Sequence, residues 1–106
     1  MKVQIKDVSV RWAEEKDLPA VLAMVQELAV FEGEPLAVSL SLAQMTHDFG
    51  AGHFVCMLAE HPEEGPLGMA FCHTRYSTWK GLTAHLEDLI VKEIYRGQGL
   101  GRLLLE

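Results

Sequence analysis

The sequence predicts a single α/β (α+β) domain, in which helices cover a mixed and mostly antiparallel sheet. Three observations carry this prediction. Apolar residues recur at helical spacing in the first third of the chain, three strand-like runs separated by turn residues follow, and the last run leads into a glycine-rich turn. The elements therefore run strand, helix, helix, strand, strand, strand, helix. At 106 residues and 49% hydrophobic composition, the chain has room for one small core.

The first half of the chain holds one strand and two helices. Apolar residues alternate from Val3 to Arg11, which predicts the first strand. Apolar residues then recur every three or four positions from Leu18 to about Glu32, which predicts an amphipathic helix with Asp17 as its N-cap. A second helix is expected over 42–49, with Ser41 as its cap.

The second half of the chain holds three strands and the start of a helix. The run Phe54–Ala59 and the return strand Leu67–Tyr76 predict an antiparallel hairpin, and Leu82–Val91 predicts the strand after it. The helix opened by the glycine turn ends at Glu106 without a glycine cap, a proline or a polar exit. Residues 1–106 are therefore expected to be the front part of one longer domain.

The charge of the chain is unevenly distributed. The net charge is −6, and between Ala13 and Cys72 a single base, Lys16, faces ten acids. An acidic first part and a basic glycine turn suit a cationic substrate meeting an anionic cofactor, although ordinary solvated faces explain the charges equally well. No basic patch with interleaved aromatic residues is present, so a nucleic-acid partner is not expected.

Composition also bears on the compartment. Cys56 and Cys72 both lie in apolar runs and are expected to be buried free thiols. No segment approaches the roughly 20 apolar residues of a membrane span, and the first residues do not resemble a signal peptide. These features favour a cytoplasmic protein without a membrane partner.

The glycine-rich turn is the most informative motif. It reads Arg96-Gly97-Gln98-Gly99-Leu100-Gly101-Arg102 and joins an apolar strand to a helix. Glycines let backbone N–H groups approach a ligand closely, and with the positive end of the helix dipole these groups bind phosphate. A dinucleotide fingerprint needs a third glycine where Arg102 stands, and the Gly-Lys-Ser/Thr of a P-loop is absent. A plain glycine turn is the alternative.

Several stretches together resemble the GNAT N-acetyltransferases, and among them the diamine/polyamine (spermidine/spermine-like) branch. The likeness covers most of the chain. It is carried by Arg11–Asp17, Gln26–Glu32, Tyr76–Gly81, His85–Val91 and Tyr95–Gly101. The glycine turn alone indicates the superfamily, whereas the Trp79-containing turn and the Leu-Glu-Asp strand indicate the branch.

The resemblance implies acetyl transfer from acetyl-CoA, without a metal, to a primary amine of a small cationic acceptor. A polyamine, a diamine and a lysine-like amino acid all remain open as acceptors, and direct attack in a ternary complex and a homodimer are expected. Family members continue with further strands that carry part of the acceptor site. A non-catalytic module that binds coenzyme A or a partner is therefore the alternative function.

The resemblance also implies roles for the cofactor-binding residues. The main chain of three strand residues is expected to contact the pantetheine arm, helped by a bulge in that strand. The glycine turn is expected to wrap the pyrophosphate through its N–H groups, while the arginine before it adds charge or braces the loop. The two sets are Leu89, Ile90 and Val91, and Arg96, Gly97, Gln98, Gly99, Leu100, Gly101 and Arg102.

An amine with a pKa near ~10.4 is almost fully protonated at neutral pH, so a base near the acceptor is needed. The resemblance implies that Glu87 is this base, because it stands at the family's base position and would act directly or through an ordered water. A surface carboxylate is the plain alternative. Glu87 and Asp88 are neighbours on a strand, so they point to opposite faces unless a bulge intervenes.

Phe31, Glu32 and Trp79 are the candidate acceptor-binding residues. Helix-end packing and a solvated acid are the alternatives for the first two, and a dimer contact or plain exposure for Trp79. The five histidines show no metal-ligand spacing, so no metal site is expected.

Overall fold

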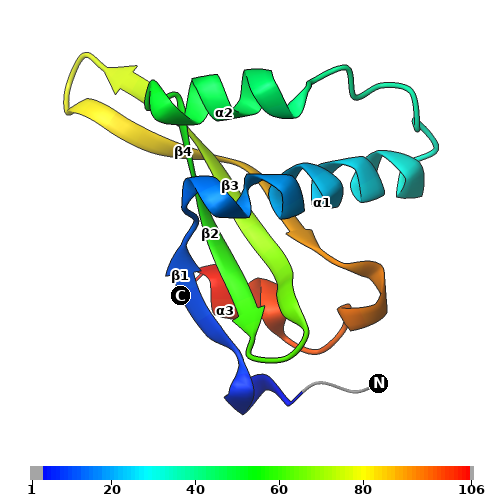
Figure 1. Cartoon of the computed structure of the whole chain (residues 1–106). Helices are drawn as coiled ribbons and strands as arrows, with labels where there is room; N and C mark the ends of the chain where they lie inside the picture. Colours follow the sequence, from blue (N-terminus) through cyan, green and yellow to red (C-terminus); the bar gives the residue numbers. More distant parts are fainter. Residues whose placement is uncertain (1–3, 106) are drawn as a thin grey trace.

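A computed structural model of the chain describes residues 4–105 and contains one four-stranded sheet with a helical layer on each face (Figure 1). The strands are β1 (Ser9–Trp12), β2 (Phe54–His61), β3 (Gly65–Ser77) and β4 (Gly81–Val91). They lie in the order β1-β2-β3-β4, and each of the three pairs is antiparallel. The helices are α1 (Leu18–Phe31), α2 (Leu42–Gly50) and α3 (Leu100–Leu105). The predicted fold class is confirmed, and the described strands form its antiparallel part.

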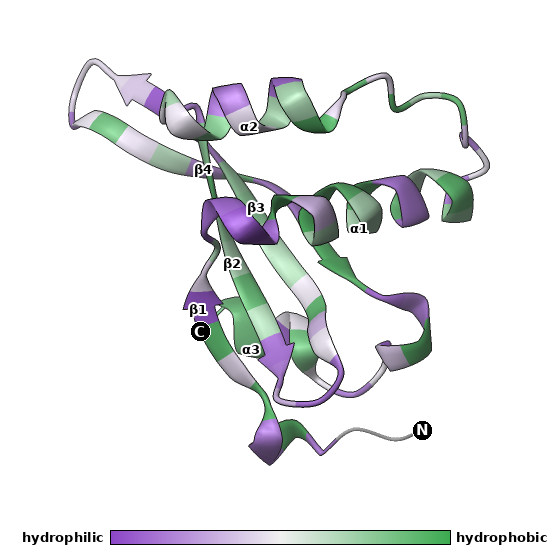
Figure 2. Cartoon of the chain, in the orientation of Figure 1, coloured by the Kyte–Doolittle hydropathy of each residue, from purple (hydrophilic) through white to green (hydrophobic). Residues whose placement is uncertain are grey.

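Two apolar clusters hold the layers together, one on each face of the sheet. On the first face, α1 and α2 pack on β2, β3 and β4 through Leu18, Val21, Met24, Met45, Cys56, Leu58, Met69 and Ile90. On the other face, α3 and the turn before it pack through Tyr95, Leu100 and Leu104 on Ala59, Leu67 and Ala70. Figure 2 shows the apolar residues concentrated along β2 and β3 between these layers. The strands therefore alternate between two buried faces, as a sheet covered on both sides requires.

The N-termini of α1 and α2 are stabilised differently. At α2 the expected cap is confirmed, since Ser41 Oγ accepts a hydrogen bond from the Gln44 N–H at 3.1 Å. Asp17 occupies the N-cap position of α1, but its side chain does not cap that helix. The carboxylate instead accepts the Glu14 N–H at 2.7 Å and is held by Arg11. The capping prediction for Asp17 was wrong because a stronger, charged partner competes for the same oxygens.

The first strand is shorter than predicted. A 3₁₀ turn, η1 (Ile5–Asp7), precedes it, with the Val8 N–H bonded to the Ile5 carbonyl at 3.1 Å. The alternation in the sequence changes phase between Ile5 and Val8, and a continuous strand cannot carry such a change. The turn takes up the extra residue, so only Ser9–Trp12 pairs with β2. Val3, the expected start, lies outside the described residues.

One register shift in the sheet governs the geometry of β4. Cys72 of β3 pairs with Leu86, while the preceding residue, Phe71, pairs with Asp88. Glu87 therefore has no partner on β3 and is the extra residue of a β-bulge. The bulge that the resemblance implied for this strand is present.

Arg11 links the start of α1 to the sheet. Its guanidinium donates two hydrogen bonds to Asp17, both 2.8 Å, and two to Glu60 on β2, at 3.0 and 2.9 Å. Bidentate hydrogen bonds to Arg11, with the Glu14 N–H, lower the pKa of Asp17 from 3.8 to about 2. The stability from this pair is thus present above the unfolded pKa and is lost as the pH falls from 3.8 through about 2.

We predict that Arg11→Ala lowers the free energy of unfolding by about 3 kcal/mol, because Asp17, only 8% exposed, loses its cation. Urea denaturation at neutral pH measures the effect. The exposed Arg102 makes no ion pair within residues 4–105, so Arg102→Ala is the matched control and changes stability by less than about 0.5 kcal/mol. Equal losses in the two variants would show that the Arg11 network does not anchor α1.

Candidate active site

The bulge brings two carboxylates onto the face of the sheet that α1 covers. Asp88 lies opposite Phe71, which packs against the core under α1 and α2. His73 is two positions further along β3 and shares this face. Glu87 Oε1 lies 3.7 Å from His73 Nε2, so the Glu87 side chain is on this face as well. An unbroken strand would have placed Glu87 and Asp88 on opposite faces.

The surroundings of Asp88 are electrostatically unfavourable for a charged carboxylate. The side chain is half-buried, and burial raises its pKa, with further upward shifts from the charges of Glu87 and Glu32. Glu32 is the C-cap residue of α1, so carboxylates from two elements converge here. A concentration of negative charge with one acid held off its ordinary pKa is typical of a functional site.

The end of α1 is fastened to the loop that follows β4. The Arg96 guanidinium lies over the Phe31 ring, with Cζ 4.2 Å from the ring centroid. Arg96 Nε also donates to the Val91 carbonyl at 2.9 Å, and Glu27 of α1 accepts the Glu93 N–H at 3.2 Å. This geometry fits the bracing role expected for Arg96. It also places Phe31 beside the glycine loop, and the Arg96 guanidinium covers one face of the Phe31 ring.

The glycine loop has the backbone conformation that phosphate binding requires. Gly97 and Gly99 have φ of +80° and +87°, in the left-handed region that side chains disfavour. Gly101 has an ordinary φ, and a Cβ there would lie 3.5 Å from Leu89 Cδ2. Within the described chain, no N–H group from Gly97 to Arg102 donates a backbone hydrogen bond. These N–H groups, in the loop and in the first turn of α3, therefore have no backbone acceptor within the described residues.

The last residues of β4 present one open backbone edge. Leu89, Ile90 and Val91 pair with β3 on one side, and no described strand pairs with the other side. This edge leads from Glu87 towards the glycine loop. Ile90 is buried, as expected for a core side chain, but Leu89 is 39% exposed because it faces the short α3 layer.

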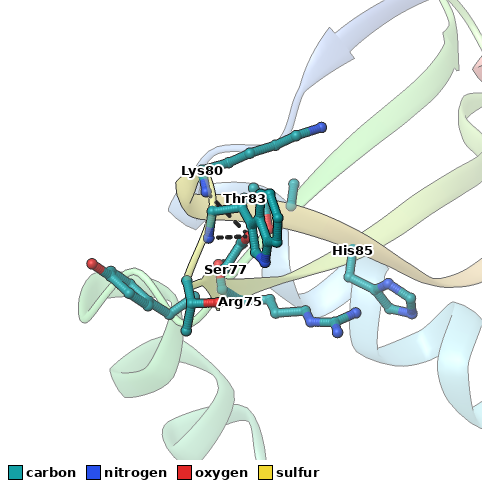
Figure 3. A pocket seen from close by; sticks show the side chains of 9 residues that line it. Arg75, Ser77, Lys80, Thr83 and His85 are labelled. Carbon is teal, nitrogen blue, oxygen red and sulfur yellow. Dashed lines mark hydrogen bonds between the residues drawn. The ribbon is translucent and has the colours of Figure 1, made fainter.

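Trp79 lies apart from the other candidate residues, at the tip of the hairpin between β3 and β4. Its side chain is 94% exposed and contributes to an open hollow at the tip (Figure 3). The structure thus groups Phe31, Glu32 and Glu87 with the glycine loop and leaves Trp79 beyond them. Sequence reasoning did not list Asp88 and His73 as members of the candidate site: the resemblance implied the bulge, but which side chains it brings together depends on the register between β3 and β4.

Neither cysteine is placed to act as a nucleophile. Cys56 is a free, buried thiol whose pKa is raised to about 12 by burial. Cys72 is also free, but it is only half-buried, so the expectation of a fully buried thiol was wrong there. Cys72 lies beside the bulge, where it pairs with the exposed Leu86.

Within residues 4–105, no group of three His, Cys, Asp or Glu side chains is arranged to hold a metal ion. Nor does any helix described here have the length and apolarity to cross a membrane.

Comparison with known proteins assigns the chain to a family. The profile of the acetyltransferase (GNAT) family matches residues 11–106. The chain belongs to the GNAT acetyltransferase family. The predicted resemblance to this family is thereby confirmed.

Among curated relatives, the chain is 36% identical to a thialysine N-epsilon-acetyltransferase of Bos taurus over 108 residues. That match covers 93% of this chain and 64% of the relative, so the chain spans less than two thirds of the relative's length. It is 33% identical to spermidine/spermine N(1)-acetyltransferase-like protein 1 of Homo sapiens over 105 residues, which cover 92% of this chain and 15% of that protein.

Among solved structures, an acetyltransferase of Trypanosoma brucei is 30% identical with a TM-score of 0.69, covering 93% of this GNAT chain and 70% of that chain. An aminoglycoside acetyltransferase from an uncultured soil metagenomic sample, solved with sisomicin, has a TM-score of 0.78. The match covers 94% and 66% of the two chains. At 16% identity it shows the fold alone.

We predict that Asp88→Asn stabilises this GNAT chain at neutral pH. A raised folded-state pKa means that the folded protein disfavours the charged form, so stability falls as the pH rises from the unfolded value of 3.8 towards the folded one. The gain should therefore appear at pH 7 and vanish well below 3.8. Thermal unfolding at both pH values measures it.

The exposed Glu63 provides the matched control, because Glu63→Gln removes the same charge far from the site. It should leave the pH dependence of unfolding unchanged. A Glu63→Gln gain as large as that of Asp88→Asn would trace the effect to net charge rather than to the site.

Proposed function

We propose that this protein is an acetyl-CoA-dependent N-acetyltransferase acting on a primary amine of a small cationic acceptor. The observation that carries the proposal is the bulge at Glu87, because it turns Glu87 and Asp88 to one face at the start of the open β4 edge. That edge ends at the glycine loop with its free N–H groups. A proton acceptor and an anion-binding loop are thus connected by one stretch of free backbone.

The loop is suited to hold the pyrophosphate of acetyl-CoA. Free N–H groups from Gly97 to Arg102 match phosphate oxygens, and the left-handed glycines keep side chains out of the way. The pantetheine arm would then pair with the open edge of Leu89–Val91. A backbone N–H on this edge would polarise the thioester carbonyl as charge develops on its oxygen.

The carboxylates are suited to receive and deprotonate the amine. Glu32 and Asp88 attract a cationic acceptor, and Glu87 then accepts the ammonium proton, directly or through a water, which frees the nitrogen lone pair. The amine attacks the thioester carbon in the ternary complex, and the C–S bond breaks to release coenzyme A as a thiolate. The buried Cys56 offers no acetyl-carrying thiol, which supports direct transfer.

A non-catalytic role as a coenzyme A-binding module is the second candidate. It is favoured by the glycine loop and the open β4 edge, which can hold coenzyme A without any contribution from the carboxylates. A second copy of the chain would be its partner, in line with a homodimer, because an exposed sheet edge favours pairing with another chain. Coenzyme A binding without transfer to any amine would support this candidate over the enzyme.

Gly99→Asp should weaken coenzyme A binding at least tenfold, since it adds a negative charge among the loop N–H groups. Gly52→Asp is the matched control: its φ of +78° is close to the +87° of Gly99, and neither added Cβ clashes, since the one at Gly99 lies 3.6 Å from Ile5 Cδ1 and the one at Gly52 has no neighbour within 4 Å. Both variants therefore carry the same strain and charge. Titration calorimetry distinguishes them, and equal affinities would remove the glycine loop from the cofactor site.

Glu87→Gln should lower the rate of acetyl transfer roughly 100-fold at neutral pH and less at high pH, where the free amine needs no base. A pH–rate profile of kcat/KM measures this, with Glu63→Gln as the control that retains the wild-type profile. A constant loss across the whole pH range would mean that Glu87 is not the base.

A further inference from the structure

The hairpin tip beyond the carboxylates has the opposite charge character. A hollow of about 550 Å³ lies there, a size typical of small-molecule sites. Its lining includes Arg75, Lys80 and His85 together with Trp79, but no acidic residue. This cluster of basic side chains contrasts with the net charge of −6 of the whole chain.

Arg75 is the cation of this hollow that faces the site. On β3 it lies two positions beyond His73, and its partner on β4, Thr83, lies two positions before His85. All four side chains therefore share the face of Glu87. Figure 3 shows the Arg75 side chain running along the hairpin towards His85, whereas Lys80 lies on the other side of the hairpin in that view. Arg75 is exposed and forms no ion pair with any side chain of residues 4–105.

One face of the hairpin therefore carries a linear sequence of charges. Glu87 and Asp88 lie at the bulge, the imidazoles of His73 and His85 contact each other at a centroid distance of 4.9 Å with their planes tilted by 50°, and Arg75 follows. Negative charge at one end and positive charge at the other match a ligand with an ammonium group and a carboxylate. A diamine or polyamine would instead place a second cation beside Arg75.

The spacing sets the length of such a ligand. Four strand positions separate Thr83 from Glu87, which is about 13 Å at ~3.3 Å per residue. The Arg75 side chain reaches back about 6 Å of this distance, which leaves about 7 Å. An extended chain of five or six carbons between a terminal amine and a carboxylate spans about the same distance.

We propose that the hollow at the hairpin tip is an anion-binding subsite of the acceptor site, in which Arg75 binds the carboxylate of an ω-amino acid. This inference rests on the proposed function for the identity of the amine end. Arg75 supplies a planar guanidinium suited to a carboxylate, and the imidazoles of His73 and His85 lie along the stretch between Arg75 and Glu87 that the aliphatic part of the ligand would cross. Glu87 then receives the distal amine.

The test compares two ligands that differ by a single carboxylate, lysine and 1,5-diaminopentane. Each is titrated into the 106-residue chain saturated with coenzyme A, which binds without transferring an acetyl group. Lysine should bind about tenfold more tightly, in line with one charge-assisted pair of hydrogen bonds. Arg75→Gln should abolish this preference, because lysine loses its guanidinium partner and 1,5-diaminopentane no longer places its second ammonium beside a cation, and Arg75→Lys should restore part of it.

Lys80→Gln is the matched control, because it removes the other exposed tip cation, which lies on the opposite side of the hairpin from Arg75 in Figure 3. It should keep the preference for lysine. Equal affinity for the two ligands, binding of neither, or equal losses in Arg75→Gln and Lys80→Gln would each overturn the subsite.

The outcome for the proposed function is separate. Acetyl transfer to either ligand is measured on the same chain with acetyl-CoA. Retained preference for lysine without any transfer would reject the enzyme and keep the subsite. Transfer with no preference would do the reverse.

Discussion

One extra residue in β4 determines where the chemistry of this molecule lies. Because Glu87 has no partner on β3, the strand changes phase between Leu86 and Asp88, and two adjacent carboxylates share one face. The same shift turns the second half of β4 so that Ile90 enters the core beneath α1. A regular strand of identical sequence would turn either Glu87 or Asp88 to the opposite face of the sheet, which α3 covers. The bulge is thus a structural requirement of the site.

The helix α1 completes the site because it is anchored at both ends. At its N-terminus, Arg11 ties Asp17 to β2, and at its C-terminus the Phe31 ring lies against Arg96 of the glycine loop. Between these anchors, Val21 and Met24 fill the core. Glu32 therefore has a fixed position relative to Asp88, and the charge of Glu32 raises the pKa of Asp88. The core and the Arg11 network offset the unfavourable free energy of placing these carboxylates close together.

The sequence predicts what depends on local pattern and misses what depends on register. The span of α1, the Ser41 cap and the three later strands follow from periodicity and turn residues, and the structure has them within a few residues. The phase change near Ile5 was visible in the alternation, but its outcome as a 3₁₀ turn depends on pairing with β2. The local sequence predicted Asp17 as the N-cap of α1, but the fold brings the guanidinium of Arg11, six residues earlier, within 2.8 Å of its carboxylate. The resemblance implied the bulge beside Glu87 and Asp88, but the contact of Glu87 with His73 follows from pairing across strands, which no local motif encodes.

A crystal structure of this chain with bound coenzyme A tests the central claim most directly. The account predicts the pyrophosphate within hydrogen-bond distance of the N–H groups from Gly97 to Arg102, with the thiol end lying along the open edge of β4 towards Glu87. It also predicts that Glu87 and Asp88 remain together on the face covered by α1. Coenzyme A bound away from the glycine loop, or a β4 in unbroken register with Glu87 facing α3, would contradict the account.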